Sequence, residues 1–305
     1  MESLFSLFSE NLFPVFLAAG AGYALAFFSP LETRSVSRIA FYIFSPCLVF
    51  ILLTDNQLGN GALLGMFAYA TTQMVLTAAL AWVASRLFGF GRRITVAIVL
   101  AGLLPNAGNF GLSVTHFAFG EAGLAQASLF FIASGVMANT LGVYLAALGN
   151  SDYRTALLGL FKLPTIYAVI LAAVFLRFGW ELPTPVARAA HVLADAAIPT
   201  MLVLLGMLLH RTRWHGNWAG LATANAVRLL AGPAIALLLA VPFGLTGVAR
   251  QAGVLEAAMP AAVMTTVLAS EFEVEPEFMT AVVFSSTLLS PLTLTPLLAY
   301  LTASG

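Results

Sequence analysis

The sequence predicts an all-α integral membrane protein of ten transmembrane helices, arranged as two inverted five-helix repeats with crossing broken helices, the fourth and the ninth. Three observations support this fold: the composition, the spacing of the apolar segments, and a group of helix-breaking residues at the centre of one segment. Hydrophobic residues make up 60% of the 305 residues, charged residues make up 9%, and the mean hydropathy is +0.96. Because soluble domains carry about 25% charged residues, almost the whole chain is expected to lie in a lipid bilayer.

The spacing of the apolar segments predicts the number of spans. Apolar runs of about 20 residues, the length that crosses a bilayer as a helix, alternate with short charged or Gly/Pro-rich turns. The ten predicted spans are residues 11–28, 35–54, 62–87, 94–119, 124–149, 158–178, 187–209, 218–241, 247–270 and 277–300. Since the linkers are short, consecutive spans are expected to be antiparallel neighbours.

The basic residues predict the orientation of these spans. When the loops are assigned alternately to two sides, nine of the 13 Lys and Arg residues fall on one side: Arg34, Arg38, Arg86, Arg92, Arg93, Arg154, Lys162, Arg211 and Arg213. The other side holds Arg177, Arg188 and Arg250, and Arg228 lies inside a span. The positive-inside rule places the nine in the cytoplasm, so both termini are expected on the extracytoplasmic side.

The fourth span is expected to break at mid-membrane. Residues 103–113 read LLPNAGNFGLS, with Pro105, Asn106, Gly108, Asn109 and Gly111 at the centre of the span. Proline removes a backbone donor, glycine lowers helix propensity, and asparagine side chains in hydrocarbon need partners. Irregular backbone at this depth is tolerated where it faces protein or a cavity, and such breaks are where transporters bind substrates and ions.

A second break is expected in residues 255–266, because the two halves of the chain resemble each other. Pro105 matches Pro260 at an offset of 155 residues, and Pro46 matches Pro199 at an offset of 153 residues. Each half, residues 1–152 and 153–305, holds five spans. Five is odd, so the second repeat must be inverted in the membrane, and the two broken spans are expected to cross near the midplane.

The polar residues of the fourth span suit an anion. Asn106 and Asn109 supply amide donors just after the break. The half-helix that begins there also presents free backbone N–H groups and the positive end of its dipole, which favour a carboxylate. In the alternative interpretation, both asparagines only satisfy the broken backbone.

Three charged residues inside predicted spans are further candidates. Glu256, four residues before Pro260, could bind sodium, carry a proton, or form a structural pair with Arg228. Arg228 could hold a carboxylate with two N–H groups or extend to the cytoplasmic interface. Asp195, four residues before Pro199, could be a proton site, a substrate gate or a solvated carboxylate in a cavity.

The serine and threonine residues of the fifth and tenth spans, Ser285 and Ser286 among them, are expected mainly to let helices pack closely. Ser134 and Asn139 in the fifth span are the best candidates there for lining the crossing.

The sequence has no P-loop and no HExxH or Gly-x-Ser-x-Gly motif, so ATP-driven transport by this chain alone is excluded. A channel, an anion sensor and an intramembrane enzyme stay open as alternatives, although no nucleophile and base pair stands out. The zero net charge gives no indication of nucleic-acid binding.

Two motifs resemble the auxin efflux carrier family of membrane transporters: PNAGNFGLS followed by FGEAGLAQASLF, and AMPAAVMTTVLASEFEVEPE followed by SSTLLSPLTLTPLLAYL. The resemblance extends over essentially the whole chain. It implies the fold of bile acid:sodium symporters, which is also like that of sodium–proton antiporters. It further implies two domains, with the helices numbered as the ten predicted spans in chain order. Helices 1, 2, 6 and 7 form a scaffold domain that dimerises, and helices 3, 4, 5, 8, 9 and 10 form a transport domain that moves like an elevator. The long cytoplasmic loop of many plant members is missing, which suits a bacterial inner-membrane protein.

The resemblance also implies a function and a set of site residues. We expect a secondary transporter of a small organic anion, such as an auxin-like carboxylate or a dicarboxylate, with sodium or protons as coupling ion and no other cofactor. The expected substrate-binding residues are Pro105, Asn106, Gly108, Asn109, Asn139, Pro260 and Ala261. The expected cation-coupling residues are Asn109, Ser134, Asp195 and Glu256, with sodium at Glu256, the position that resembles the sodium-binding glutamate of bile acid:sodium symporters. Arg228 is the candidate for an ion pair or a substrate carboxylate contact.

Overall fold

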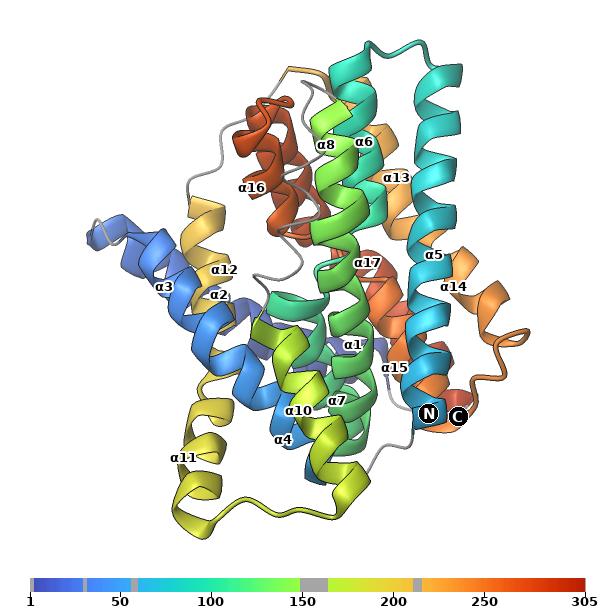
Figure 1. Cartoon of the computed structure of the whole chain (residues 1–305). Coiled ribbons are helices and arrows are strands. Elements are labelled where there is room, and N and C mark those ends of the chain that lie inside the picture. Colours follow the sequence, from blue (N-terminus) through green and yellow to red (C-terminus); the bar gives the residue numbers. More distant parts are fainter. Residues whose placement is uncertain (1–2, 30–31, 56–59, 149–163, 211–215, 305) are drawn as a thin grey trace.

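The computed structural model describes residues 3–29, 32–55, 60–148, 164–210 and 216–304, and these ranges are helical without any strand (Figure 1). The α-helices are α1 (Leu4–Leu7), α2 (Phe13–Phe28), α3 (Thr33–Ile39), α4 (Ser45–Asp55), α5 (Asn60–Leu87), α6 (Arg92–Leu103), α7 (Leu112–Met137), α8 (Val143–Leu148), α10 (Pro164–Phe178), α11 (Thr184–Asp195), α12 (Ala197–His210), α13 (Trp218–Ala226), α14 (Gly232–Ala240), α15 (Gly247–Ala257), α16 (Met264–Glu271) and α17 (Pro276–Ala303). Wider π-helical turns join several of them: η1 (Phe8–Leu12), η2 (Ala40–Phe44), η3 (Ala107–Gly111), η4 (Ala138–Gly142) and η5 (Val227–Ala231).

Seven helical segments of the described residues are long and apolar enough to cross a membrane: Leu4–Phe28, Ser35–Asp55, Leu63–Leu87, Ala107–Leu148, Thr184–His210, Trp218–Ala240 and Pro276–Ala303. The predicted all-helical membrane protein is therefore confirmed, while the number of ten spans stays a prediction. The two numbers differ for physical reasons. α6, α15 and α16 hold 12, 11 and 8 residues and are too short to span on their own. Ala107–Leu148 merges parts of two predicted spans across Gly120, where a φ of 63° makes a turn that glycine adopts readily.

Some of the predicted features lie outside the described residues. These are the basic residues Arg154, Lys162, Arg211 and Arg213, and the first part of the predicted span 158–178. The described part of that span is α10, a shorter apolar helix.

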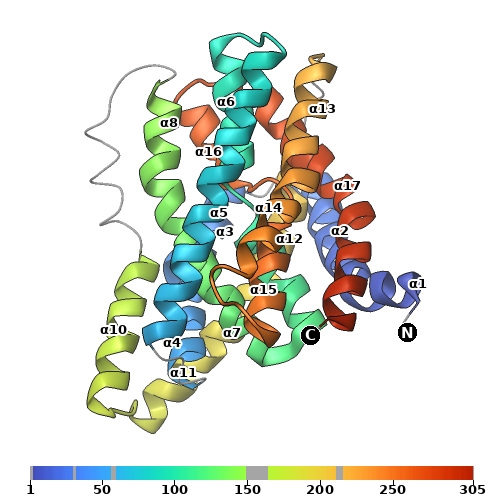
Figure 2. The same ribbon diagram turned by 90° about the vertical axis from the view of Figure 1, so that its right-hand side faces the viewer.

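The helices pack in two groups. α2 packs along α12, and α4 packs against α10 and α11. In the other group α5 packs against α6, and α15 packs against α7 and α14. Both views place α10 and α11 at one end of the molecule and α6 and α13 at the other, and the two termini lie near each other (Figures 1 and 2). The contact between α1 and α17 agrees with this placement of the termini.

Glycine allows the close approach of α2 and α12. A Cβ atom at Gly22 would overlap the carbonyl group of Val203, and one at Gly206 would overlap the carbonyl group of Ala19. Each helix therefore contributes a glycine at the point where it touches the backbone of the other. This is the small-residue packing expected of membrane helices, which gain little from the hydrophobic effect in lipid.

Candidate functional site: the crossing of two broken helices

Two helices break inside the protein and meet at their breaks. α6 ends at Leu103 and η3 begins at Ala107, and α15 ends at Ala257 and α16 begins at Met264. Between them, Pro105 and Ala261 form an isolated antiparallel β-bridge. Asn106 N donates to Pro260 O at 2.8 Å, and Ala262 N donates to Leu104 O at 2.9 Å. The two extended segments thus satisfy each other's backbone groups, which hydrocarbon could not do.

The bridge places Pro105 opposite Ala261. The match of Pro105 with Pro260 compares equivalent positions of the two halves and does not predict which residues face each other. The donors across the bridge are Asn106 and Ala262, so neither proline stands where an N–H group is required. Ala261 N is free to donate to Ser286 Oγ on α17 at 3.1 Å. Ser286, expected mainly to aid packing, therefore also fixes the second break.

The crossing brings four half-helix ends together, with opposite polarity. α6 and α15 end there, so their last carbonyl groups and negative dipole ends point at it. η3, which leads into α7, and α16 begin there, so their first N–H groups and positive dipole ends point at it. The crossing therefore has one side suited to a cation and one side suited to an anion.

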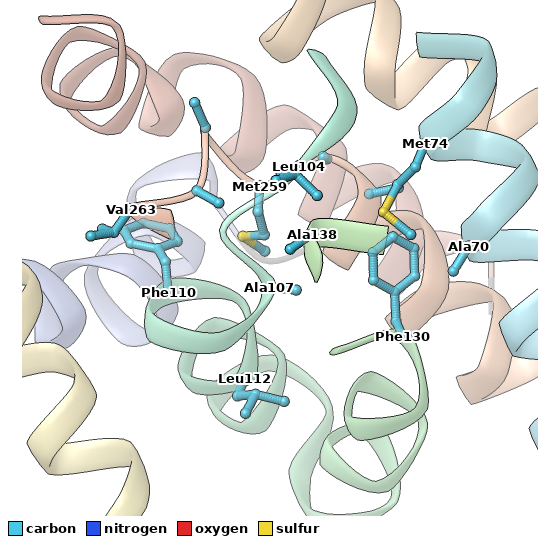
Figure 3. Packing of buried hydrophobic residues seen from close by; sticks show 14 of the residues in the cluster. Ala70, Met74, Leu104, Ala107, Phe110, Leu112, Phe130, Ala138, Met259 and Val263 are labelled. Carbon is cyan, nitrogen blue, oxygen red and sulfur yellow. The ribbon is translucent and has the colours of Figure 1, made fainter. Parts of the chain in front are cut away.

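Apolar side chains from both breaks surround this backbone. Figure 3 shows Leu104 and Ala107 from the first break and Met259 and Val263 from the second in one buried cluster. Phe110 of η3 packs edge-on against Phe16 of α2, with ring centroids 5.8 Å apart. Water-poor surroundings of this kind strengthen any charge interaction at the crossing.

Three polar side chains of the first break are buried without a full set of partners. Asn106 and Asn109 are each 3% exposed, and Ser113 is fully buried. Asn106 Nδ2, Asn109 Oδ1 and Ser113 Oγ have no hydrogen-bond partner within the protein. A buried polar atom left unpaired costs about 1–3 kcal/mol, a cost that a hydrogen bond to a ligand would offset. The alternative in which both asparagines only satisfy the broken backbone leaves these atoms unexplained.

Glu256 lies fully buried in α15 and faces the first break. Its Oε1 accepts a hydrogen bond of 2.8 Å from Thr115 Oγ1 of α7, and its Oε2 has no partner within the protein. A Cβ atom at Gly111 would overlap the carboxyl group, so glycine at this position makes the contact between α15 and η3 possible. Glu256 Oε2 and Asn109 Oδ1 are both unpaired oxygen acceptors, the ligand atoms that suit a hard cation such as sodium, and of the two residues only Glu256 can take up a proton. The described residues hold no group of three or more His, Cys, Asp or Glu that could bind a metal ion.

Arg228 lies in η5 and is fully buried, so its side chain does not extend to the cytoplasmic interface, one of the roles considered on the sequence. Its Nε has no hydrogen-bond partner within the protein. Nη1 donates to Gly102 O at 2.7 Å, and Nη2 donates to Ala257 O. Neither of these two partners is Glu256. The guanidinium group is therefore bonded to the carbonyl ends of α6 and α15.

The other predicted site residues differ in how deeply they are buried and in what they contact. Gly108 is buried in η3, where an added Cβ would meet the ring of Phe131. Ser134 is buried in α7, and Asn139 is half-buried and donates to Gly135 O of its own helix at 3.0 Å. Asp195 is exposed at the end of α11, which packs against α4 and η2. It lies outside the group of buried polar residues at the crossing.

Thr115 is a site residue that sequence reasoning missed. It lies four residues after Gly111 and so shares its helix face, which is the one signal that could have drawn attention to it. Its contact with Glu256 spans 141 residues of sequence, and helix periodicity does not give such long-range pairs.

Comparison with known proteins agrees with this architecture. A family model described as membrane transport protein matches residues 7–157 and 150–298. An uncharacterized transporter of Methanothermobacter thermautotrophicus is 26% identical over 289 residues, which cover 92% of this chain and 94% of the relative. An uncharacterized transporter of Methanocaldococcus jannaschii is 25% identical over 285 residues, which cover 88% of this chain and 91% of the relative. A probable auxin efflux carrier component of Oryza sativa subsp. japonica is 34% identical over 135 residues, which are 43% of this chain and 24% of the rice protein.

The resemblance read from the two crossing motifs is confirmed by these matches. The family model covers nearly the whole chain, and two archaeal transporters align with it almost from end to end. The chain therefore belongs to the auxin efflux carrier family of membrane transport proteins.

Proposed function

We propose that this protein is a secondary active transporter of a small organic anion, a carboxylate of the auxin-like or dicarboxylate class. The observation that carries the proposal is the unpaired, buried donor Asn106 Nδ2 at the start of the half-helix that η3 and α7 form. A carboxylate placed there would accept from this amide and from the free N–H groups of the half-helix, in the field of its positive end. Asn109, Gly108, Pro105, Pro260 and Ala261 shape the same region, and Asn139 lies further along the chain on η4.

The transport mechanism proposed is alternating access of the elevator type. This mechanism needs ten spans in two inverted repeats, residues 1–152 and 153–305. The first, second, sixth and seventh predicted spans, residues 11–28, 35–54, 158–178 and 187–209, would form a scaffold that dimerises. The packing supports this division, because helices of these four spans pack together: α2 along α12, and α4 against α10 and α11. The remaining spans would move as one body that carries the crossing. The protein would sit in a bacterial inner membrane with both termini outside, and the closeness of the two termini supports their common side.

Coupling is assigned to Glu256. Its unpaired Oε2 and the unpaired Asn109 Oδ1 supply oxygen ligands for sodium, and Glu256 alone could carry a proton. Ser134 and Asp195 are secondary candidates for the same role. In this scheme the anion is recognised mainly at the fourth span and the cation mainly at the ninth.

A ligand screen followed by flux tests the function. The purified protein is heated with a panel of monocarboxylates and dicarboxylates, in sodium and in potassium, and the stabilising compounds are then offered to proteoliposomes. We expect saturable uptake of a stabilising carboxylate, accelerated by an inward sodium or proton gradient. Saturable binding without flux would instead indicate an anion sensor. Flux that saturates but ignores both gradients would indicate an uncoupled facilitator, and currents far above carrier rates a channel.

The role of Glu256 in coupling gives a separate prediction. Glu256→Gln keeps the size of the side chain and the acceptor for Thr115, but removes the titratable carboxyl group. Gradient-driven uptake is expected to fall about tenfold or more, because coupling between two bound ions typically amounts to 1–3 kcal/mol. Anion exchange without a gradient should persist. The control is Glu277→Gln, the same change at an exposed position of α17. Uptake by Glu256→Gln that still follows the gradient as in the wild type would remove Glu256 from the coupling scheme.

A further inference from the structure

Arg228 is a buried charge without an acidic partner. It is the largest fully buried side chain of the described residues, with an exposed fraction of 0%. The ion pairs found in the described part of the chain involve His116 with Glu121 and His191 with Asp55, and none involves Arg228. An arginine at this depth in a membrane protein is costly unless something compensates its charge.

The compensation comes from two half-helix ends. Nη1 and Nη2 bond to the carbonyl groups of Gly102 and Ala257, which belong to the last turns of α6 and α15. Each helix C-terminus carries roughly half a negative charge. Two such ends together balance the single positive charge of the guanidinium group. Because the planar guanidinium group carries donors on both of its terminal nitrogen atoms, one side chain can bond to both helix ends at once.

The arginine is itself held in place by its surroundings. The helix α14, which directly continues η5, is anchored to α5, because Gln73 Nε2 donates to Gly232 O at 3.2 Å and Tyr69 Oη donates to Ala236 O at 3.0 Å. Gly232, one turn after Arg228, has no side chain, and a Cβ there would meet the guanidinium group. The guanidinium group is thus held between the ends of α6 and α15, next to Gly232.

In transporters with discontinuous helices, carbonyl groups at half-helix C-terminal ends commonly coordinate sodium or a proton. Here a side chain of the protein bonds to these carbonyl groups. We propose that Arg228 is a built-in cation, which bonds to the carbonyl ends of α6 and α15 in place of a bound metal ion and so positions both half-helices at the crossing. The opposite, N-terminal ends of η3 and α16 are then left free for the anion, and any coupling cation is confined to the region of Glu256. Arg228 is accordingly a positioning residue, which acts on the crossing through the two half-helices. Only its consequence for transport rests on the proposed function.

Chemical rescue tests this role without relying on transport. Arg228→Ala removes the guanidinium group and leaves a space lined by the two carbonyl groups. We expect the variant to be less heat-stable in detergent than the wild type, and to be restabilised by millimolar guanidinium or methylguanidinium in a saturable way, with sodium and potassium much less effective. Arg250→Ala is the matched control, because Arg250 is a partly exposed arginine bonded to Tyr300 and Ser304. Its stability should not respond to guanidinium.

Two further variants cover the case in which Arg228→Ala does not fold. Arg228→Lys keeps the charge and is expected to fold, with flux at least tenfold below the wild type if the proposed transport is correct, because one ammonium group cannot bridge both carbonyl ends as the guanidinium group does. Arg228→Met keeps most of the volume without the charge and is expected to be less stable than Arg228→Lys. The proposal is overturned if Arg228→Met matches the wild type in stability, if Arg228→Lys does not fold, or if a folded Arg228→Ala shows no saturable response to guanidinium. A protein that transports nothing would still show the rescue, so the two proposals fail separately.

Discussion

Replacing Asn106 by alanine is expected to weaken anion binding by about 10- to 100-fold. The side-chain amide is buried, and its Nδ2 has no partner within the protein, so its hydrogen bond to a bound carboxylate would be made without losing another. A hydrogen bond to a charged group contributes about 1.5–3 kcal/mol, and each 1.4 kcal/mol changes affinity tenfold. The measurement is the dissociation constant of the best carboxylate from the ligand screen, obtained from the concentration dependence of thermal stabilisation.

Two variants make this prediction specific to the amide donor. Asn106→Asp keeps the shape but replaces the donor by a negative charge, so its loss of affinity should exceed that of Asn106→Ala. Asn11→Ala is the matched control, because Asn11 is a buried asparagine of η1 whose amide is already bonded to Leu7 O at 3.0 Å. Affinity should change little there. Equal effects at Asn106 and Asn11 would mean that the anion does not bind at the first break.

Adding one methyl group at Gly22 is expected to destabilise the whole protein. In Gly22→Ala the new Cβ would overlap the carbonyl group of Val203, and backbone cannot move aside as a side chain can. α2 and α12 must separate along their contact, at a cost of about 3 kcal/mol, the upper end of ordinary overpacking. The melting temperature in detergent should fall on the order of 5 to 10 °C. Gly206→Ala, on the other side of the contact, should behave alike.

The same helix supplies the control for this steric effect. Gly20 is exposed, and nothing lies within 4 Å of a Cβ placed on it. Gly20→Ala should leave stability unchanged or raise it slightly, because alanine has the higher helix propensity. If Gly22→Ala and Gly20→Ala melt at the same temperature, α2 and α12 do not pack as described.

The sequence predicted those features of the fold that depend on local composition. Apolar runs and sparse charge identify a helical membrane protein, and Pro105 and Pro260 mark the two places where a helix ends inside the protein. The family was recognisable for the same reason, because its signature lies in these breaks. The polarity of the crossing followed from the order of half-helices along the chain, without knowledge of any side-chain contact.

Contacts between helices were not predictable to the same degree. Arg228 could be placed inside a span, but its two carbonyl partners depend on the rotation and depth of η5 relative to α6 and α15. The pairing of Pro105 with Ala261 was not predictable either, since backbone donors and not side-chain identity decide it. Glu256 was found because a carboxyl group is rare at this depth, whereas Thr115 is an ordinary residue for a membrane helix.

Counterflow in proteoliposomes tests most directly whether the crossing carries an organic anion across the membrane. Vesicles loaded with an unlabelled carboxylate that stabilises the protein are diluted into a trace of the same compound in labelled form. For the wild type we predict transient accumulation of label above the level of protein-free vesicles, with strongly reduced accumulation for Asn106→Ala and normal accumulation for Asn11→Ala. Stabilising binding without any counterflow in the wild type, or counterflow that Asn106→Ala leaves intact, would contradict the account.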